Sequence, residues 1–331
     1  MVNSKKRILT GDRPTGALHL GHYVGSLANR VKLQNDYESY IIIADVQALT
    51  THWDKDDHLR NDIMQITEDY LAAGLNPELS TIFIQSMIPE IHELTMYYAM
   101  FTMVNVLRHN PTVKTEAAQH GFKEMSYGFL GYPLSQVADI SIFKANLVPV
   151  GEDQLPHIEL ARRVIRRFNE LYKPVLIEPE ALVGEVPRLV GLDGKSKMSK
   201  SLGNAIYLCD DARTVQDKVK NAVTDPARIH KNDPGHPEVC TVYEYHSVFN
   251  RPELEEIESN CRQGKIGCVE CKKNLAVKLN NLLEPMRERR QQYNQAAIKD
   301  ILMEGTRKAH AAALDTMAEV REAMAINYFD R

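Results

Sequence analysis

The feature that most constrains the fold is an alternation of short apolar runs with longer helical stretches in the first half of this 331-residue chain. Four runs rich in β-branched and apolar residues are typical of strands buried on both faces, at residues 7–11, 40–45, 80–85 and 147–151. Helical stretches lie between and after them, at residues 23–33, 56–73, 88–103 and 153–171. This rhythm predicts an α/β fold with a parallel sheet and right-handed crossovers.

The second half of the chain has a different pattern. Strand-like runs end near residue 210, and residues 271–326 are rich in Ala, Leu, Lys, Glu and Arg. We expect a small bundle of helices here, interrupted at Pro285 and Gly305. Because the chain exceeds the usual size of one hydrophobic core, we predict two domains, residues 1–205 and 206–331, with the boundary near 185–205.

Composition excludes several classes of protein. Hydrophobic residues make up 44% and charged residues 25%, and the formal net charge is −4, which argues against a nucleic-acid binder that is basic throughout. No apolar run reaches the length of a membrane span, and the N-terminal stretch does not resemble a signal peptide. Five cysteines are too few for a secreted disulfide framework. We therefore expect a cytoplasmic protein that binds neither membrane nor DNA.

A glycine-punctuated turn follows the first predicted strand. It reads GDRPTGALHLGHY over residues 11–23 and leads into a helix, the place where an α/β sheet binds nucleotides. His19 and His22 are three apart, so they share one side of a helical turn and can donate to a phosphoryl oxygen. Taken alone, they could equally be two surface histidines at the start of a helix.

A second segment suited to phosphate lies between the two predicted domains. Residues 191–201 read GLDGKSKMSKS and carry three lysines and three serines. A mobile loop of this kind can grip a polyphosphate during a reaction and release it afterwards. The two segments together favour a phosphate-handling enzyme over an ordinary solvated loop.

The two segments resemble the hallmarks of the class I aminoacyl-tRNA synthetases. His19-Leu20-Gly21-His22 is similar to their His-Ile-Gly-His motif, and residues 197–201 match their Lys-Met-Ser-Lys-Ser loop. Further runs resemble the bacterial tryptophanyl-tRNA synthetases over nearly the whole chain: PTGALHLGHYVGSL, IIIADVQALT, GYPLSQVADI and VPVGEDQ. The resemblance implies a Rossmann-type catalytic domain, followed by an α-helical anticodon-binding domain. It also implies an enzyme that activates L-tryptophan with ATP, releases pyrophosphate and transfers tryptophan to tRNA(Trp).

The resemblance also implies roles for residues around ATP. His19 and His22 would stabilise the transition state at the α-phosphorus, Lys197 and Lys200 would bind the departing pyrophosphate, and Mg²⁺ would bridge the phosphates. Lys114 would add a phosphate contact. The full set expected to contact ATP is Arg13, Pro14, Thr15, Gly21, His22, Gly151, Glu152, Asp153, Leu189, Lys197, Met198, Ser199, Lys200 and Ser201.

A tryptophan pocket is expected on one helix face. Tyr132, Gln136 and Asp139 are spaced i, i+4 and i+7, which places them on one face if the segment is helical, and we expect the helix to start after Pro133. By analogy with the family, Asp139 would accept the indole N–H, while Tyr132 and Gln154 would hold the α-ammonium group. The expected pocket consists of Tyr132, Gln136, Asp139, Gln154 and an apolar wall from Val148 and Val150.

Two departures from the family leave other enzymes open. Many members have Met at the position of Gln136 and His at the position of Gln47. A Gln three residues before an Asp also resembles tyrosyl-tRNA synthetases, where the pair grips the phenol. The pair alone therefore does not exclude tyrosine, and a paralogous nucleotidyltransferase that charges no tRNA is a further alternative.

Four cysteines in the second half form a candidate metal site. Cys261, Cys268 and Cys271 are spaced C-x6-C-x2-C, and Cys240 precedes them. Four thiolates suffice for a tetrahedral zinc site or for an iron–sulfur cluster, and unliganded thiols are the third reading. A subset of tryptophanyl-tRNA synthetases is similar in the final spacing and carries a [4Fe–4S] cluster in the anticodon-binding domain.

The family also implies a homodimer, and Arg287, Arg289 and Arg290 are candidate contacts to tRNA phosphates.

Overall fold

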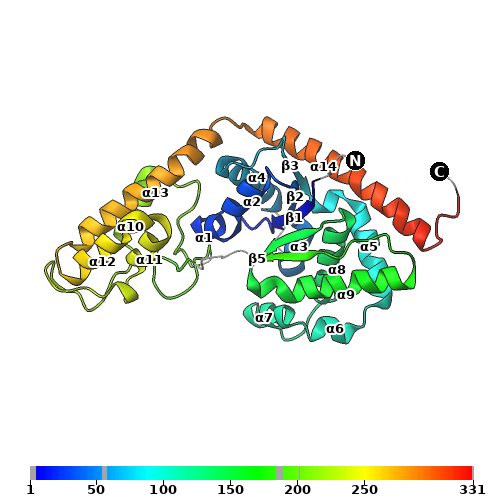
Figure 1. Cartoon of the computed structure of the whole chain (residues 1–331), viewed down its shortest axis with the longest axis horizontal. Helices are drawn as coiled ribbons and strands as arrows, with labels where there is room; N and C mark the ends of the chain where they lie inside the picture. Colours follow the sequence, from blue (N-terminus) through cyan, green and yellow to red (C-terminus); the bar gives the residue numbers. More distant parts are fainter. Residues whose placement is uncertain (1–4, 54–57, 184–188, 201, 330–331) are drawn as a thin grey trace.

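A five-stranded parallel sheet forms the centre of the molecule (Figure 1). The structure is a computed structural model, and it describes residues 5–53, 58–183, 189–200 and 202–329. The order is β3-β2-β1-β4-β5, and every pairing is parallel. The predicted α/β class and all four predicted strands are confirmed; the fifth strand is short and half exposed, so its sequence carries no strong strand pattern. The strands are β1 (Arg7–Asp12), β2 (Glu38–Ile43), β3 (Ser80–Ile84), β4 (Leu147–Val150) and β5 (Glu180–Val183).

Helices cover both faces of this sheet. Side chains alternate along β2: Ile41 and Ile43 pack into one hydrophobic cluster with helix α4, and Tyr40 and Ile42 pack into another with helices α5, α8 and α9. Burial on both faces explains why the strands read as continuous apolar runs. A π-helical turn (Tyr23–Leu27) joins α1 to α2. The helices of this part are α1 (Leu20–His22), α2 (Ala28–Leu33), α3 (Asp45–His52), α4 (Leu59–Ala73), α5 (Pro89–Phe101), α6 (Val104–Arg108), α7 (Pro111–Gln119), α8 (Tyr127–Ile142) and α9 (Leu155–Leu171).

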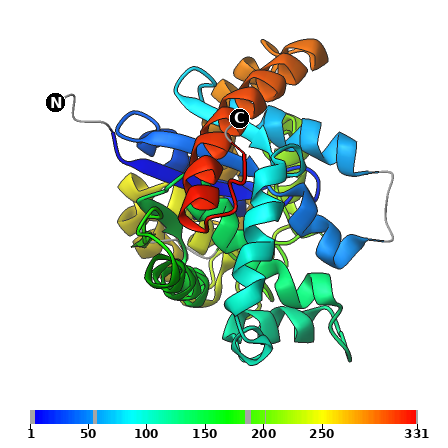
Figure 2. The same ribbon diagram turned by 90° about the vertical axis from the view of Figure 1, so that its right-hand side faces the viewer.

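The second half is helical, as predicted. Figure 1 shows α10 to α13 gathered at one end of the molecule, while α14 runs back along the sheet, and Figure 2 shows α14 crossing in front of the strands. These helices are α10 (Ala212–Lys220), α11 (Thr241–Phe249), α12 (Leu254–Arg262), α13 (Cys268–Arg290) and α14 (Gln295–Ala323).

The predicted breaks at Pro285 and Gly305 are wrong. Helix α13 continues through Pro285, and α14 continues through Gly305. The chain turns instead between them, where the side chain of Asn294 caps α14 by accepting from the N–H of Ala297 at 2.9 Å.

Gly305 has a packing role that its sequence neighbourhood does not reveal. A Cβ at this position would lie 1.9 Å from the carbonyl oxygen of Ile82 on β3, so only glycine lets the helix approach the strand this closely. Beside it, the N–H of Ile84 donates to the hydroxyl of Thr306 at 3.4 Å. Helix α14 thereby covers β3, the edge strand of the sheet.

Further contacts attach α14 to the sheet part of the molecule. Arg321 pairs with Glu93 of α5, and Lys144 pairs with Glu319 at 2.6 Å. The boundary at residues 205/206 stays a prediction, but the last helix packs against the first part of the chain, and only α10 to α13 form a separate lobe.

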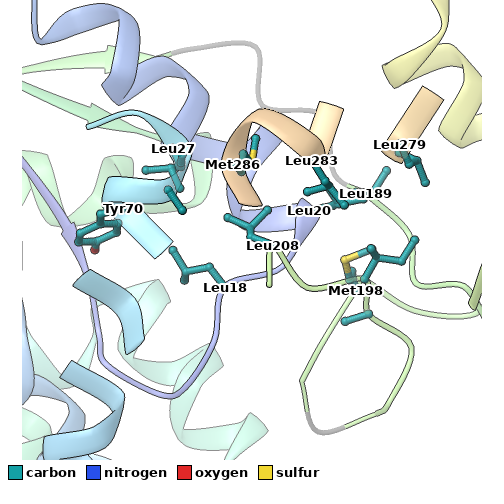
Figure 3. Close-up of a cluster of buried hydrophobic side chains, with 14 of the residues drawn as sticks. Leu18, Leu20, Leu27, Tyr70, Leu189, Met198, Leu208, Leu279, Leu283 and Met286 are labelled. Atoms are coloured by element: carbon teal, nitrogen blue, oxygen red, sulfur yellow. The ribbon is translucent and has the colours of Figure 1, made fainter. Parts of the chain in front are cut away.

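A shared hydrophobic cluster joins that lobe to the sheet. Figure 3 shows Leu283 and Met286 of α13 near Leu20 and Leu208, and all four belong to one buried cluster. Among the helices that the structure describes, none is long and apolar enough to cross a bilayer.

Candidate functional site

A pocket of about 620 Å³ lies at the switch point of the sheet. Strand β1 pairs with β2 on one side and with β4 on the other, and in such sheets ligands bind beyond the carboxyl ends of the strands where the order reverses. Of the residues expected at the ATP and tryptophan sites, those that line the pocket are Arg13, Gly21, His22, Tyr132, Gln136, Asp139, Val148, Val150, Gly151, Gln154 and Lys197.

The two predicted imidazoles lie together. Their ring centroids are 3.8 Å apart, and Nδ1 of His22 accepts from the backbone N–H of His19 at 3.2 Å. Burial is the main cause that lowers the pKa of His19 to about 3 and that of His22 to about 4, and the charges of Lys200 and Lys197 act in the same direction. Both rings are therefore neutral at pH 7, so each can donate one hydrogen bond without carrying charge.

The segment that carries these histidines is held against the chain that follows the lysine loop. The N–H of Leu20 donates to the carbonyl of Ile206, and the N–H of Leu208 donates to the carbonyl of Leu18, each at 2.9 Å. Gly21 permits the close packing, since a Cβ there would lie 2.9 Å from the ring of His19. Backbone hydrogen bonds thus join the histidine segment to the chain that follows the lysine loop, although the two segments are far apart in sequence.

The lysine loop is folded onto the molecule. Met198, expected at ATP, is only 2% exposed, and its N–H donates to the carbonyl of Leu189, also buried. The N–H of Ser199 donates to Oδ1 of Asn204 at 2.8 Å. The buried side chain of Met198 and the side chain of Asn204 therefore support the loop in this structure, and the loop backbone forms turns.

Lysines 197 and 200 make different contacts. Lys197 lines the pocket, whereas Nζ of Lys200 donates to the carbonyl of Gly16 at 2.7 Å and to Oγ1 of Thr15 at 3.3 Å. Burial lowers the pKa of Lys200, although Asp12, Asp69 and Asp62 oppose the shift. The lysine loop and the turn after β1 are thereby brought into contact.

The other residues expected at ATP lie outside the pocket lining. Pro14 is buried, while Thr15 and Glu152 are exposed. Lys114 is exposed on α7. Ser201 and the side chain of Asp153 lie outside the described residues.

An ion pair supports the pocket floor. Arg30 pairs with the carboxylate of Asp12, which also accepts from the hydroxyl of Tyr70 at 2.7 Å. Burial alone would raise the pKa of Asp12, but the neighbouring Arg30 guanidinium outweighs it and holds the pKa well below its usual range. Nothing in the sequence pattern singled out this pair.

Tyr132, Gln136 and Asp139 lie on one face of α8, as their spacing predicts, and all three line the pocket. The expected helix start after Pro133 is wrong: α8 begins at Tyr127, and its N-cap Ser126 accepts from the N–H of Phe129 at 3.1 Å. Proline is tolerated within the helix here.

Asp139 has a partner that the sequence did not reveal. Nε2 of Gln85 donates to both carboxylate oxygens, at 2.8 and 3.0 Å. Burial raises the pKa of Asp139 to about 7, against the lowering effect of Gln85, and the charge of Asp45 adds to the rise. Asp139 is thus a buried carboxyl that titrates near neutrality.

Glu116 of α7 also faces the pocket and was missed. Its Oε1 accepts from Nη2 of Arg13 at 3.0 Å. Burial raises the pKa of the Tyr132 hydroxyl, and the nearby carboxylate of Glu116 adds to the rise. The same hydroxyl lies 3.3 Å from Nε2 of His157. No motif marks Glu116, because one polar residue on an amphipathic helix has no distinguishing pattern.

The four predicted cysteines occupy one neighbourhood of the helical lobe. Burial is the main cause that raises the pKa of Cys271 to about 12, and the charges of Cys240, Cys261 and Cys268 contribute to the rise. Nη1 of Arg228 lies 3.7 Å from Sγ of Cys261 and 3.9 Å from Sγ of Cys268. Within the described ranges, however, no group of three or more His, Cys, Asp and Glu side chains is arranged to hold a metal ion. The iron–sulfur motif is therefore not established by the geometry.

The arginines expected at tRNA phosphates make contacts within the chain. Nε of Arg287 donates to the carbonyl of Asp210 at 3.0 Å, Nε of Arg289 donates to the carbonyl of Ala72 at 2.7 Å, and Arg290 pairs with Glu68 and Asp69. Arg289 and Arg290 thereby connect α13 to α4, and the contact with phosphate stays a prediction.

Comparison with known proteins decides the family. The model of the class I tRNA synthetases for W and Y matches residues 1–284. The chain belongs to this family. It is 50% identical to the tryptophan–tRNA ligase of Clostridium longisporum, over 99% of both chains, and 50% identical to that of Streptococcus pyogenes, over 98% of this chain and 100% of the other. Among solved structures, a Campylobacter jejuni tryptophanyl-tRNA synthetase complexed with ADP and tryptophan has a TM-score of 0.86 at 29% identity, over 96% of this chain and 99% of that one. The predicted Rossmann-like class I fold and the predicted aminoacyl-tRNA synthetase activity are confirmed.

Proposed function

We propose that this chain is a tryptophan–tRNA ligase, which forms tryptophanyl-adenylate from L-tryptophan and ATP and then transfers tryptophan to tRNA(Trp). The observation that carries the proposal is a single pocket lined by His22, Lys197 and Asp139, so phosphate-binding groups and an indole acceptor share one cavity. Curated tryptophan–tRNA ligases that are 50% identical over nearly the whole chain support the same amino acid and bear out the prediction.

Tryptophan would bind along α8. Indole has one hydrogen-bond donor and no acceptor, and an ionised carboxylate only accepts, so Asp139 is a suitable partner. Val148 and Val150 would flank the ring, and Gln136 lies between Asp139 and Tyr132 on the same helix face. The amino group would then extend toward Tyr132 and Gln154, nearer to the histidines.

Activation requires stabilisation of charge rather than a general base. The tryptophan carboxylate is already a nucleophile, and it attacks the α-phosphorus while pyrophosphate leaves. Neutral His19 and His22 would donate to the phosphoryl oxygens, and Lys197 and Lys200 would bind the pyrophosphate. Arg13 and Gly151 line the same cavity and would contact ATP. Mg²⁺ bound to the phosphates would offset their charge.

In the second step the aminoacyl group passes to the terminal ribose of tRNA. We assign anticodon binding to the lobe of α10 to α13, which stands apart from the sheet in Figure 1. This assignment follows the family's organisation, and we propose that the protein acts in the cytoplasm with the translation apparatus.

The four cysteines would hold a metal centre in that lobe, a [4Fe–4S] cluster or, as the alternative, Zn²⁺. The donor set fits in number, and a cation would relieve the mutual repulsion that raises the pKa of Cys271. Protein purified without oxygen should be brown and contain about four irons per chain. Colourless protein with one zinc per chain would support the alternative. Protein without any bound metal would contradict the proposed metal centre. Cys271→Ser should then lose the metal while keeping tryptophan activation.

A homodimer is supported by an apolar surface on α5 and α6. Met96, Met100, Met103 and Val104 are each more than half exposed there, and they adjoin a groove of about 360 Å³ lined in part by Phe101 and Leu160. Sedimentation analysis of the wild type should give twice the mass of one chain, and the Met100→Glu variant should have the mass of a single chain. A wild-type monomer would contradict the assignment.

Amino-acid-dependent exchange between ATP and pyrophosphate tests the function. Tryptophan should drive the exchange and tyrosine should not. Exchange driven by tyrosine would identify a tyrosyl-tRNA synthetase, and no exchange with either amino acid would favour the paralogous nucleotidyltransferase.

A further inference from the structure

The pocket must neutralise the positive α-ammonium group of its amino-acid substrate. An ammonium ion that leaves water needs hydrogen-bond acceptors and a compensating negative charge. Tyr132 and Gln154, assigned to this group above, are both uncharged. The described side chains that line the pocket include three carboxylates, those of Asp12, Glu116 and Asp139.

Two of these carboxylates have other tasks. Asp12 accepts from Arg30 through both carboxylate oxygens and also from the hydroxyl of Tyr70. Asp139 accepts from Gln85 through both oxygens and is assigned to the indole N–H at the far end of the pocket. Neither is placed to receive the ammonium group beside Tyr132.

Glu116 is placed for it. Its side chain is 18% exposed, it lines the pocket with Tyr132, and its carboxylate is near enough to the Tyr132 hydroxyl to contribute to the raised pKa of that group. The ion pair with Arg13, at 3.0 Å through Oε1, orients the carboxylate. A carboxylate has about four acceptor positions, so an ion pair on one oxygen leaves capacity for further donors.

We propose that Glu116 is the carboxylate that binds the α-ammonium group of tryptophan. The inference rests on the proposed tryptophan site. It adds a charged group, contributed by α7, to the neutral pair Tyr132 and Gln154. The same carboxylate holds Arg13, a residue assigned to ATP, so the amino-acid and nucleotide subsites meet at Glu116.

Three ligands that differ by one functional group test the proposal. Tryptophan has both the amino and the carboxyl group, tryptamine lacks the carboxyl group, and indole-3-propionate lacks the amino group. Calorimetric titration of the full-length wild type and Glu116→Gln gives the dissociation constant for each. Glutamine keeps the size and an acceptor oxygen and removes only the charge.

We expect Glu116→Gln to weaken tryptophan and tryptamine by roughly tenfold to a hundredfold, the range for a hydrogen bond to a charged group. Indole-3-propionate should bind as before or more tightly, because its carboxylate no longer meets a negative side chain. Equal loss for all three ligands would show that Glu116 only shapes the pocket, and no loss for any of them would remove it from the site. Either result overturns the proposal.

Two further variants complete the experiment. Glu124→Gln changes an exposed glutamate in the segment after α7 and should bind all three ligands like the wild type. Asp139→Asn should weaken all three, because every ligand contains the indole. Failure of the indole assignment would therefore appear in the Asp139 variant, whereas failure of the ammonium assignment would appear as lost selectivity in the Glu116 variant.

Discussion

Replacing Asp139 by asparagine should change the pH dependence of stability as well as tryptophan binding. Burial raises the pKa of this carboxyl from 3.8 to about 7 in the folded protein. The folded state therefore keeps a proton that the unfolded state releases. Its stabilising effect is complete below pH 4 and is lost as the pH rises toward and through 7.

The size of the effect follows from the shift. Each pKa unit corresponds to about 1.4 kcal/mol, so the buried carboxylate lowers the free energy of unfolding by about 4 kcal/mol at pH 8 and by about 2 kcal/mol at pH 5. Asparagine does not titrate. The free energy of unfolding of Asp139→Asn, relative to wild type, should therefore rise by about 2 to 3 kcal/mol between pH 5 and pH 8.

Urea unfolding of both proteins at the two pH values measures this difference. Contributions that do not depend on pH, such as a poorer contact between asparagine and Gln85, cancel in the comparison. Other titrating groups are the same in both proteins and cancel as well. A relative stability that stays constant from pH 5 to pH 8 would refute a raised pKa at Asp139.

Three other changes have definite expected outcomes. Lys197→Ala and Lys200→Ala should slow ATP–pyrophosphate exchange and leave the dissociation constant of tryptophan nearly unchanged, because their charge acts on the leaving group; weaker tryptophan binding would contradict the assignment of the loop. Arg30→Leu leaves the partly buried Asp12 without its cation and should lower the free energy of unfolding by up to about 3–5 kcal/mol, and a loss below 1 kcal/mol in denaturant titration would argue against a structural ion pair. Gly305→Ala should lower the melting temperature, because its Cβ would collide with the carbonyl of Ile82, whereas the exposed control Gly128→Ala meets no atom within 4 Å; equal melting temperatures would contradict the close contact.

Much of the fold and part of the site could be predicted, for physical reasons that particular residues illustrate. Strands buried on both faces leave a continuous apolar run, so β2 was evident from residues 40–45, and a helix face repeats regularly, so Tyr132, Gln136 and Asp139 were grouped correctly. Gly305 was misread because its role depends on Ile82, a residue distant in sequence, and Pro285 was misread because a helix can continue through a proline. Gln85 and Glu116 were missed for the same reason, since each matters only through a partner from another element.

The return of α14 to the sheet has a consequence for how the chain is made. Strand β3 is synthesised early, yet the helix that covers its edge comes from residues 295–323, more than 200 residues later. A nascent chain therefore carries an exposed parallel edge through most of its synthesis, and an open edge of this kind is a template for pairing with other chains. The sheet completes its protection only when α14 arrives, so premature termination anywhere before residue 295 would yield a product with an uncovered edge strand, a natural target for chaperones and proteases.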